Sequence, residues 1–323
     1  MVKLLAVTLG DRYGVGPELA ARLPDLFSIP DGMRVVMVGD KRVFEAGRTI
    51  AGARGDYPVI ASFAEAKAPW SLLHRPFEAE LEPLGRVSEA AGREVLGTLA
   101  FLVEAAQSGQ IGGIVYAPLN KQAMRDAGHA AGDELEFFRQ HIKADATGEI
   151  NILGEVWTSR VTSHVPLREV GALITPANVM RGITLLADAR RLSGRAPRLA
   201  IAALNPHAGE GGAFGREEID VLAPTITEAR ARGFDIAGPF PSDTVFPRAV
   251  SGAFNGVVTM FHDQGQIALK MIGLGQGITL LAGFPVPIAT PGHGTAYDIA
   301  GMGKARPDGL VAATRLVASM MGF

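Results

Sequence analysis

The chain has 323 residues, of which 47% are apolar, and a net charge of −2. This length fits two α/β lobes with ample buried cores, and the charge excludes bulk attraction to nucleic acid or an anionic membrane. The lack of cysteine excludes disulfides and thiolate chemistry. The N-terminus shows no signal-peptide pattern, and no run of about 18 apolar residues predicts a membrane span. We therefore expect a cytoplasmic protein with a small-molecule partner.

Short apolar segments alternate with longer helical segments along the chain. The segments that predict buried strands are Lys3–Thr8, Arg34–Val38, Gly113–Tyr116, Arg198–Ala203 and Gly256–Met260, and those that predict helices are Ser88–Ser108, Pro176–Leu192 and Glu217–Arg232. Ser88 predicts an N-cap. The arginines Arg190, Arg191 and Arg195 fit a solvated helix end. The alternation predicts a mostly parallel sheet with helices on both faces, where sites lie beyond the carboxyl ends of strands.

A glycine-rich turn follows the first predicted strand. Residues Gly10 to Glu18 read GDRYGVGPE, and Pro17 fits the first turn of a helix, where its missing N–H costs nothing. Backbone N–H groups in this turn could bind an anion or a substrate oxygen. The usual Gly-x-Gly-x-x-Gly dinucleotide fingerprint is absent, and a turn that needs positive φ explains the glycines equally well.

Three of the seven histidines follow apolar runs and precede turn residues. They are His164 in SHVP, His207 in NPHAGE and His262 in FHDQG. Because strand ends hold side chains rigidly, three imidazoles there can converge on one point, and neutral imidazole is the commonest ligand of divalent metals. A three-histidine site suits hydrolysis, hydration or oxidation of an alcohol. The alternative is three unrelated polar residues near turns.

A longer string near the C-terminus is more specific. His293 to Ala305 reads HGTAYDIAGMGKA, and it resembles the adenosine-binding loop of isocitrate and isopropylmalate dehydrogenases. Further strings are similar to a narrower family, the 4-hydroxythreonine-4-phosphate dehydrogenases of pyridoxal phosphate biosynthesis. These strings are the Gly10–Glu18 turn, Ala117–Lys121, His164–Leu167, Asn205–Gly212 with Glu217 and Glu218, Gly238 and Pro239 with Asp243 and Thr244, and His262–Gly265 with Lys270.

The resemblance implies a two-lobed α/β/α fold like that of isocitrate and isopropylmalate dehydrogenases, with mostly parallel sheets. Residues 1–130 and 286–323 would form the first lobe, which includes the adenosine-binding loop. Residues 131–285 would form the second lobe, which carries the metal histidines and the dimer interface. The active site would lie in the cleft between the lobes.

The resemblance also implies an NAD-dependent oxidation of a 3-hydroxy acid, followed by loss of carbon dioxide, in a homodimer. His164, His207 and His262 would bind a divalent metal, which could be Zn²⁺, Co²⁺, Ni²⁺, Mn²⁺ or Mg²⁺, and the second subunit would supply His262. The metal would lower the pKa of the substrate hydroxyl and later stabilise an enolate. The residues that would bind the cofactor are His293, Gly294, Thr295, Ala296, Asp298 and Ala305. Arg306 beside them could favour NADP, although a surface arginine is the alternative.

Two carboxylates and a lysine are candidates for proton transfer. Asp243 or Asp263 could orient a ligand histidine or take a proton. For Asp243 the alternative is a cap of the turn before Thr244. Lys270 would face the substrate or the enolate, with a solvated helix lysine as the alternative.

Several substrate contacts of the family are replaced in this chain. Glu134 and Leu135 stand where the family has a histidine and a threonine, Ile288 stands where it has an arginine, and Thr279 replaces an asparagine. Isoleucine offers no donor to a phosphate, and a glutamate repels one. We therefore hypothesise a substrate without phosphate, such as an aromatic cis-dihydrodiol carboxylate.

Other strings favour the phosphorylated substrate. Asn120 and Lys121 belong to the Ala117–Lys121 string, which is similar to that of enzymes acting on hydroxythreonine phosphate or sugar-acid phosphates. Two functions of other classes also remain: a metal-dependent hydrolase or lyase without nucleotide, and a metabolite-binding protein without activity. The adenosine-type loop speaks against the first, and the histidines with Lys270 speak against the second.

Overall fold

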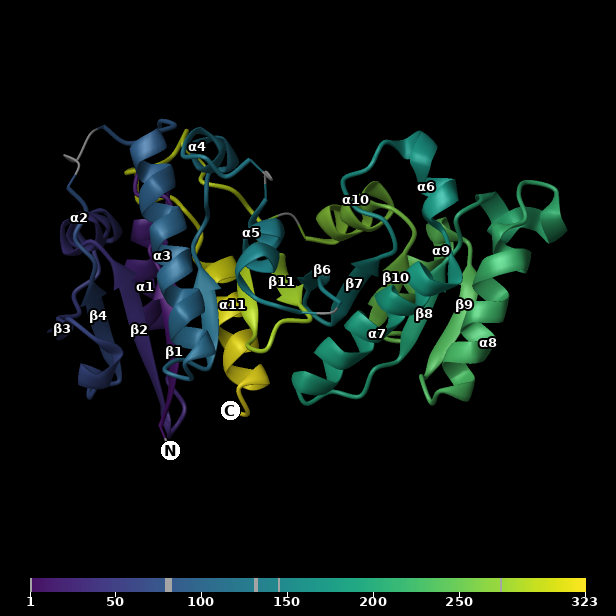
Figure 1. Cartoon of the computed structure of the whole chain (residues 1–323), viewed down its shortest axis with the longest axis horizontal. Coiled ribbons are helices and arrows are strands. Elements are labelled where there is room, and N and C mark those ends of the chain that lie inside the picture. Colours follow the sequence, from purple (N-terminus) through teal and green to yellow (C-terminus); the bar gives the residue numbers. More distant parts are fainter. Residues whose placement is uncertain (1, 79–82, 131–132, 145, 274) are drawn as a thin grey trace. The chain divides into compact units, whose positions relative to one another are not determined.

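The computed structural model describes residues 2–78, 83–130, 133–144, 146–273 and 275–323. The chain divides into two compact units, Met1–Ala144 with Phe284–Phe323, and Asp145–Gly283 (Figure 1). The boundary predicted after residue 130 falls beside residues 131 and 132, which lie outside the described residues. Helix α5 (Glu134–His141), predicted for the second unit, belongs to the first. The reason is packing, because the ring of Phe138 lies 6.1 Å from that of Tyr116.

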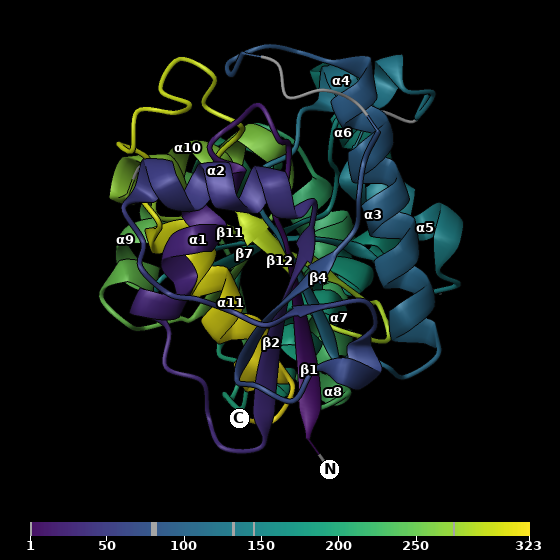
Figure 2. The same cartoon turned by 90° about the vertical axis from the view of Figure 1, so that its left-hand side faces the viewer.

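The first unit contains a parallel sheet between two groups of helices. Its strands are β1 (Lys3–Thr8), β2 (Met33–Gly39), β3 (Val59–Ile60), β4 (Trp70–His74), β5 (Gly113–Tyr116) and β12 (Ile288–Pro291), in the order β3-β4-β2-β1-β5-β12. Its other elements are α1 (Gly16–Leu26), α2 (Lys41–Ala51), the short turn η1 (Phe63–Glu65), α3 (Glu89–Gln107), α4 (Lys121–Asp126) and α11 (Asp308–Met320). Figure 2 shows α1, α2 and α11 on one side of strands β1 and β2, and α3 on the other.

The second unit contains a mixed sheet. Its strands are β6 (Gly148–Leu153), β7 (Val156–Arg160), β8 (Leu199–Ala202), β9 (Ile236–Phe240), β10 (Gly256–Thr259) and β11 (Ile278–Ala282), in the order β11-β6-β7-β10-β8-β9. Strand β6 is antiparallel to both of its neighbours, whereas β7, β10, β8 and β9 run parallel. Its helical segments are α6 (Leu167–Leu173), α7 (Pro176–Leu192), η2 (Pro206–Gly212), η3 (Glu218–Leu222), α8 (Ala223–Ala231), α9 (Ser242–Val250) and α10 (His262–Ile272).

Both faces of this second sheet are covered, as its continuous apolar strands require. Val257 on β10 packs in one cluster with Phe246 of α9 and Leu269 of α10. The next residue, Val258, points to the opposite face, where a Cβ on Gly182 of α7 would lie 3.3 Å from its side chain. The carboxyl ends of the parallel strands are therefore held between packed helices.

The predicted mostly parallel α/β fold is confirmed. The predicted N-cap is confirmed as well, because Ser88 accepts a hydrogen bond from the backbone N–H of Ala91 at 3.4 Å at the start of α3. The helix predicted over residues 217–232 is interrupted by the π-helical turn η3, since Pro224 offers no N–H to the preceding turn. Arg190 was expected at a solvated helix end. It is instead 2% exposed, with its guanidinium 4.8 Å from the ring centre of Trp157.

Among the described residues, no single helix is long and apolar enough to cross a membrane. The pair α6 and α7, bent by 93°, passes that test together by length and composition.

Candidate functional site

The three candidate metal histidines all follow strands of the second unit. His164 comes after β7, His207 after β8 and His262 after β10, and these strands are neighbours in the order β7-β10-β8. Because β10 runs parallel to both of its neighbours, the three carboxyl ends lie at the same edge of the sheet. The predicted position at strand ends is therefore confirmed for all three residues.

Two of these histidines lie side by side in one chain. The ring centres of His164 and His262 are 5.6 Å apart. Two imidazoles on one ion, with metal–nitrogen bonds of roughly 2.0–2.1 Å, place their ring centres about 5 Å apart. Nδ1 of His262 hydrogen-bonds to the Asp263 carboxylate at 2.7 Å, which leaves Nε2 for a metal. Each of these two histidines could therefore supply one nitrogen ligand to a divalent metal.

The loop that carries His207 has an unusual backbone. His207, Ala208 and Glu210 all have positive φ, as does His164 in its own loop. Positive φ is uncommon outside glycine and costs energy, so the surrounding structure must hold it. At η2 the holding group is the carboxylate of Glu218, which accepts hydrogen bonds from the backbone N–H groups of residues 204 and 205 at 2.8 Å each.

Glu218 is a functional candidate that the sequence analysis named within a family string without giving it a role. Its side chain is buried, and it also accepts a hydrogen bond from the side chain of Asn205 at 2.9 Å. A Cβ on Gly209 would lie 2.8 Å from the same carboxylate, which explains why this tight turn needs glycine. The sequence signal for Glu218 was its place, next to Glu217, in the string that resembles the family.

The other predicted groups of the second unit lie on helices. Asp243 is exposed in the first turn of α9, a helix whose N-cap residue is Pro241. Lys270 is exposed in the last turn of α10. Thr279 accepts a hydrogen bond from the side chain of Asn151 at 3.0 Å. Within the described part of a single chain, no group of three His, Asp or Glu side chains is placed to hold a metal.

In the first unit, the glycine-rich turn and the adenosine-type loop are in direct contact. The N–H of Val15 donates to the carbonyl of Thr295 at 3.0 Å, and a Cβ on Gly14 would lie 2.8 Å from the Thr295 side chain. Gly14 is therefore required by the close approach of the loop. Thr295 itself is buried, which makes it a support of the loop.

A second set of contacts holds the end of this loop. Oε2 of Glu18 accepts a hydrogen bond from the N–H of Gly303 at 3.0 Å. Arg22 donates to the carbonyl oxygens of Gly303 at 2.6 Å and Ala305 at 3.1 Å. Burial raises the pKa of Glu18, and the hydrogen bond from Gly303 opposes that rise. Helix α1 therefore anchors a loop that is nearly three hundred residues away in sequence.

Part of this loop is open to solvent. His293, Gly294 and Ala296 lie at its start, and nothing within 4 Å would meet a Cβ on Gly294. Asp298 is exposed and can accept hydrogen bonds from ribose hydroxyls. Arg306 is already paired with Asp308 at 3.0 Å, as expected of a surface arginine.

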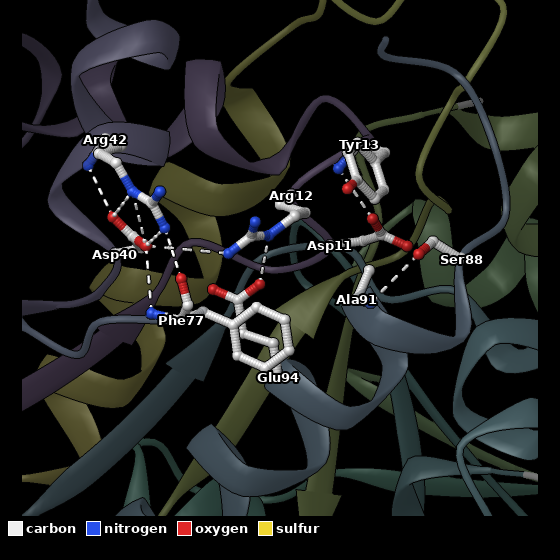
Figure 3. Close-up of polar contacts among 9 residues, drawn as sticks. All are labelled: Asp11, Arg12, Tyr13, Asp40, Arg42, Phe77, Ser88, Ala91 and Glu94. Carbon is white, nitrogen blue, oxygen red and sulfur yellow. Dashed lines mark hydrogen bonds and ion pairs between the residues drawn. The ribbon is translucent and has the colours of Figure 1, made fainter. Parts of the chain in front are cut away.

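Beside the turn lies a cluster of buried charges (Figure 3). Nε of Arg12 donates to Glu94 at 2.5 Å, and Nη2 of Arg12 lies 3.9 Å from the fully buried Asp40. Burial raises the pKa of Glu94, although the hydrogen bond from Arg12 opposes it. For Asp40, burial is outweighed by hydrogen bonds from the Arg42 side chain and backbone and from the N–H of Phe77, so its pKa is lowered.

The residues predicted to replace phosphate contacts take two kinds of position. Leu135 and Ile288 are buried, and Ile288 is 0% exposed within β12. Glu134 forms an ion pair with Lys121, whose Nζ lies 3.8 Å from the Glu134 carboxylate. Asn120 caps α4 by accepting a hydrogen bond from the N–H of Ala123 at 2.8 Å. The carboxylate of Glu134 therefore partly offsets the positive charge of Lys121, which could otherwise attract a phosphate.

Comparison with known proteins assigns these features to one family. A family model described as pyridoxal phosphate biosynthetic protein PdxA matches residues 31–317. The 4-hydroxythreonine-4-phosphate dehydrogenase of Aromatoleum aromaticum is 37% identical, over 98% of this chain and 96% of that protein. The crystal structure of the Klebsiella pneumoniae enzyme of the same name superimposes with a TM-score of 0.84 at 31% identity, covering 100% and 99% of the two chains.

Two further structures bear on fold and substrate. A terephthalate 1,2-cis-dihydrodiol dehydrogenase from Burkholderia xenovorans has a TM-score of 0.69 at 26% identity, with 98% of each chain covered. An isocitrate dehydrogenase from Methylococcus capsulatus shares the fold alone, with a TM-score of 0.50 at 14% identity over 97% of this chain and 84% of that one.

Proposed function

The chain belongs to the family of the pyridoxal phosphate biosynthetic protein PdxA, and on that premise we propose that it is an NAD-dependent, divalent-metal-dependent dehydrogenase. It would oxidise a 3-hydroxy acid, and the resulting 3-keto acid would lose carbon dioxide. The observation that carries the proposal is the position of His164, His207 and His262 at the carboxyl ends of three neighbouring strands, with Asp263 hydrogen-bonded to His262. The anchored adenosine-type loop also supports a dehydrogenase, because a hydrolase or lyase does not need a nucleotide site.

The roles of the residues follow from their chemistry. When bound, a divalent metal would lower the pKa of the substrate hydroxyl and stabilise the enolate after decarboxylation. His164, His207 and His262 would hold it, and Asp263 orients His262. Lys270 and Asp243, both exposed on helices of the same unit, are the proposed proton donor and acceptor.

NAD is the proposed nucleotide, and NADP is the alternative. The loop of His293, Gly294, Thr295, Ala296, Asp298 and Ala305 would bind its adenosine half. Arg306 directly follows this loop and could bind a 2′-phosphate, and its pairing with Asp308 supports NAD.

The substrate we propose carries no phosphate. Ile288 offers no donor and is buried, and Glu134 offsets the charge of Lys121. An aromatic cis-dihydrodiol carboxylate has the required hydroxyl next to a carboxylate-bearing carbon. The named activities of the Aromatoleum and Klebsiella relatives favour the phosphorylated alternative, 4-phosphohydroxythreonine.

A homodimer is part of the proposal, with His262 reaching the partner's site. Helix α10 begins at His262, and its Ile267 and Met271 are 63% and 82% exposed. Exposed apolar side chains one helical turn apart suit contact with a second subunit.

The test is a screen for NADH and NADPH production with added Zn²⁺, Mn²⁺ or Mg²⁺. It compares 4-phosphohydroxythreonine and four-carbon sugar-acid phosphates with unphosphorylated hydroxy acids and a cis-dihydrodiol dicarboxylate. Turnover only without phosphate supports the proposal in full. Turnover only with phosphate retains the dehydrogenase and removes the assigned roles of Glu134 and Ile288. Metal-dependent hydrolysis without reduction of nucleotide would overturn the dehydrogenase itself.

A further inference from the structure

Asp11 is a buried carboxylate at the meeting point of three distant segments. Its Oδ1 accepts a hydrogen bond from the N–H of Tyr13 at 2.9 Å, and its Oδ2 accepts one from the hydroxyl of Tyr297 at 2.6 Å. Its own N–H donates to the carbonyl of Pro118 at 3.0 Å. One residue, 1% exposed, thus ties the glycine-rich turn to the adenosine-type loop and to the 117–121 string.

This carboxylate occupies an unfavourable environment. Burial raises the pKa of Asp11, and the hydrogen bonds from Tyr297 and from the Tyr13 backbone oppose that rise. Burial and the neighbouring carboxylate both raise the pKa of Tyr297 far above the ordinary tyrosine value, so its hydroxyl remains a donor. A buried carboxylate costs stability unless its hydrogen bonds offset the loss of water. A purely structural contact here would be served as well by an apolar pair.

The loop around Tyr297 has little regular structure of its own. Residues 292–306 form no helix or strand, and Ala296 has a φ of +43°. Tyr297 is enclosed from a second side, because a Cβ on Gly85 would lie 2.7 Å from the Tyr297 carbonyl oxygen. Gly85 in turn donates its N–H to the carbonyl of Tyr13 at 2.8 Å. The conformation of the loop therefore depends on side-chain contacts with the turn.

We propose that the Asp11–Tyr297 hydrogen bond is a clamp that sets the loop 293–305 in the conformation that binds the nucleotide. Asp11 is then a positioning residue, which acts through Tyr297 on the half-buried His293 and on the exposed Gly294 and Asp298. The inference rests on the proposed function, because it takes this loop as the nucleotide site. The clamp itself can be measured without nucleotide.

The first experiment follows backbone hydrogen exchange of the nucleotide-free protein in wild type, Tyr297→Phe and Tyr57→Phe. The Tyr57 variant makes the same chemical change in the same unit, at a ring that packs on Phe44. We expect amides of residues 293–298 to exchange roughly tenfold faster in Tyr297→Phe only, as the loss of one charge-assisted hydrogen bond implies. Unchanged exchange in Tyr297→Phe overturns the clamp and leaves the proposed function standing.

The second experiment titrates the same proteins with NADH by fluorescence. We expect the Kd of Tyr297→Phe for NADH to rise roughly tenfold. Asp11→Asn keeps an acceptor for the Tyr13 N–H and can still pair with the Tyr297 hydroxyl. Its Kd for NADH should therefore lie between those of wild type and Tyr297→Phe. Equal Kd values for all variants would contradict the positioning role. A wild-type protein that binds neither NADH nor NADPH would overturn the proposed function, whatever the exchange data show.

Discussion

Asp40 shows how a single buried carboxylate ties stability to pH. Its folded-state pKa is lowered, since hydrogen bonds from Arg42 and Phe77 outweigh the effect of burial. A group with a lowered pKa stabilises the fold above its unfolded-state pKa of about 3.9, and this stabilisation is lost as the pH falls through the folded-state value. For Glu94 and Asp11 the dependence of stability on pH has the opposite sign, because burial raises their pKa values.

We therefore predict that Asp40→Asn lowers the thermal midpoint at pH 7 and that the difference from wild type shrinks below about pH 3.5. The loss at pH 7 should be roughly 1–3 kcal/mol, the value of hydrogen bonds to a charged group. Melting curves of both proteins between pH 7 and pH 3 measure it. A difference that stays constant with pH would mean that the carboxylate charge of Asp40 does not stabilise the fold.

Side-chain environment is the part of the molecule that local sequence predicts least. The three histidines were found because each follows an apolar run, which is a local pattern. The burial of Arg190 against Trp157 and of Ile288 in β12 depends on strand pairing, which no local pattern encodes. The same holds for the contact of Asp11 with Tyr297, which are 286 residues apart in sequence.

At the scale of elements, the loop at η2 depends on one buried side chain. Glu218→Gln leaves the shape of the side chain but weakens its acceptance of hydrogen bonds from the N–H groups that hold the His207 loop. We expect metal affinity to fall about 10- to 100-fold, as for other residues that orient a ligand. Zn²⁺ titration by calorimetry measures it. The control is Asp220→Asn on the same segment, whose carboxylate pairs with Arg216 at the surface. Equal affinities for both variants would show that Glu218 does not act on the site.

The contact between turn and loop gives a second prediction at this scale. A methyl group at residue 14 would lie 2.8 Å from the Thr295 side chain, so Gly14→Ala must displace the loop. We expect a destabilisation of roughly 1–3 kcal/mol and weaker nucleotide binding. Gly97→Ala on α3 is the control, because a Cβ there meets nothing within 4 Å, and a helical alanine should stabilise by about 0.5–1 kcal/mol. Thermal melting and NADH titration distinguish the two, and an unaffected Gly14→Ala protein would rule out the close contact.

Some of the elements were predicted from the sequence, whereas their pairing was not. Strands β1, β2, β5, β8 and β10 and helices α3 and α7 follow from apolar runs and helical periodicity. Strands β6 and β11 escaped prediction because their burial comes from antiparallel partners distant in sequence, as in the pairing of Leu280 with Ile150. The interruption at η3 needed the position of Pro224 relative to the loop that Glu218 holds, and this too is a tertiary feature.

At the scale of the whole molecule, the question is which chain supplies His262. The structure brings His262 next to His164 within one chain, whereas the proposed homodimer exchanges it between subunits. Co-expression of His164→Ala with His262→Ala under different tags yields a mixed dimer that separates these arrangements. If His262 crosses, one of the two sites has all three histidines, and the mixed dimer should recover about half of the wild-type metal content and activity.

A second mixed dimer is the control for this prediction. His164→Ala with His207→Ala leaves every site one ligand short if both histidines belong to the same subunit, so it should stay inactive. Failure of the first pair to recover metal, measured by elemental analysis of the purified mixed dimer, would assign His262 to its own chain. The exposed Ile267 and Met271 of α10 would then need another explanation, because their contact with a partner would no longer position the histidine at the start of the same helix.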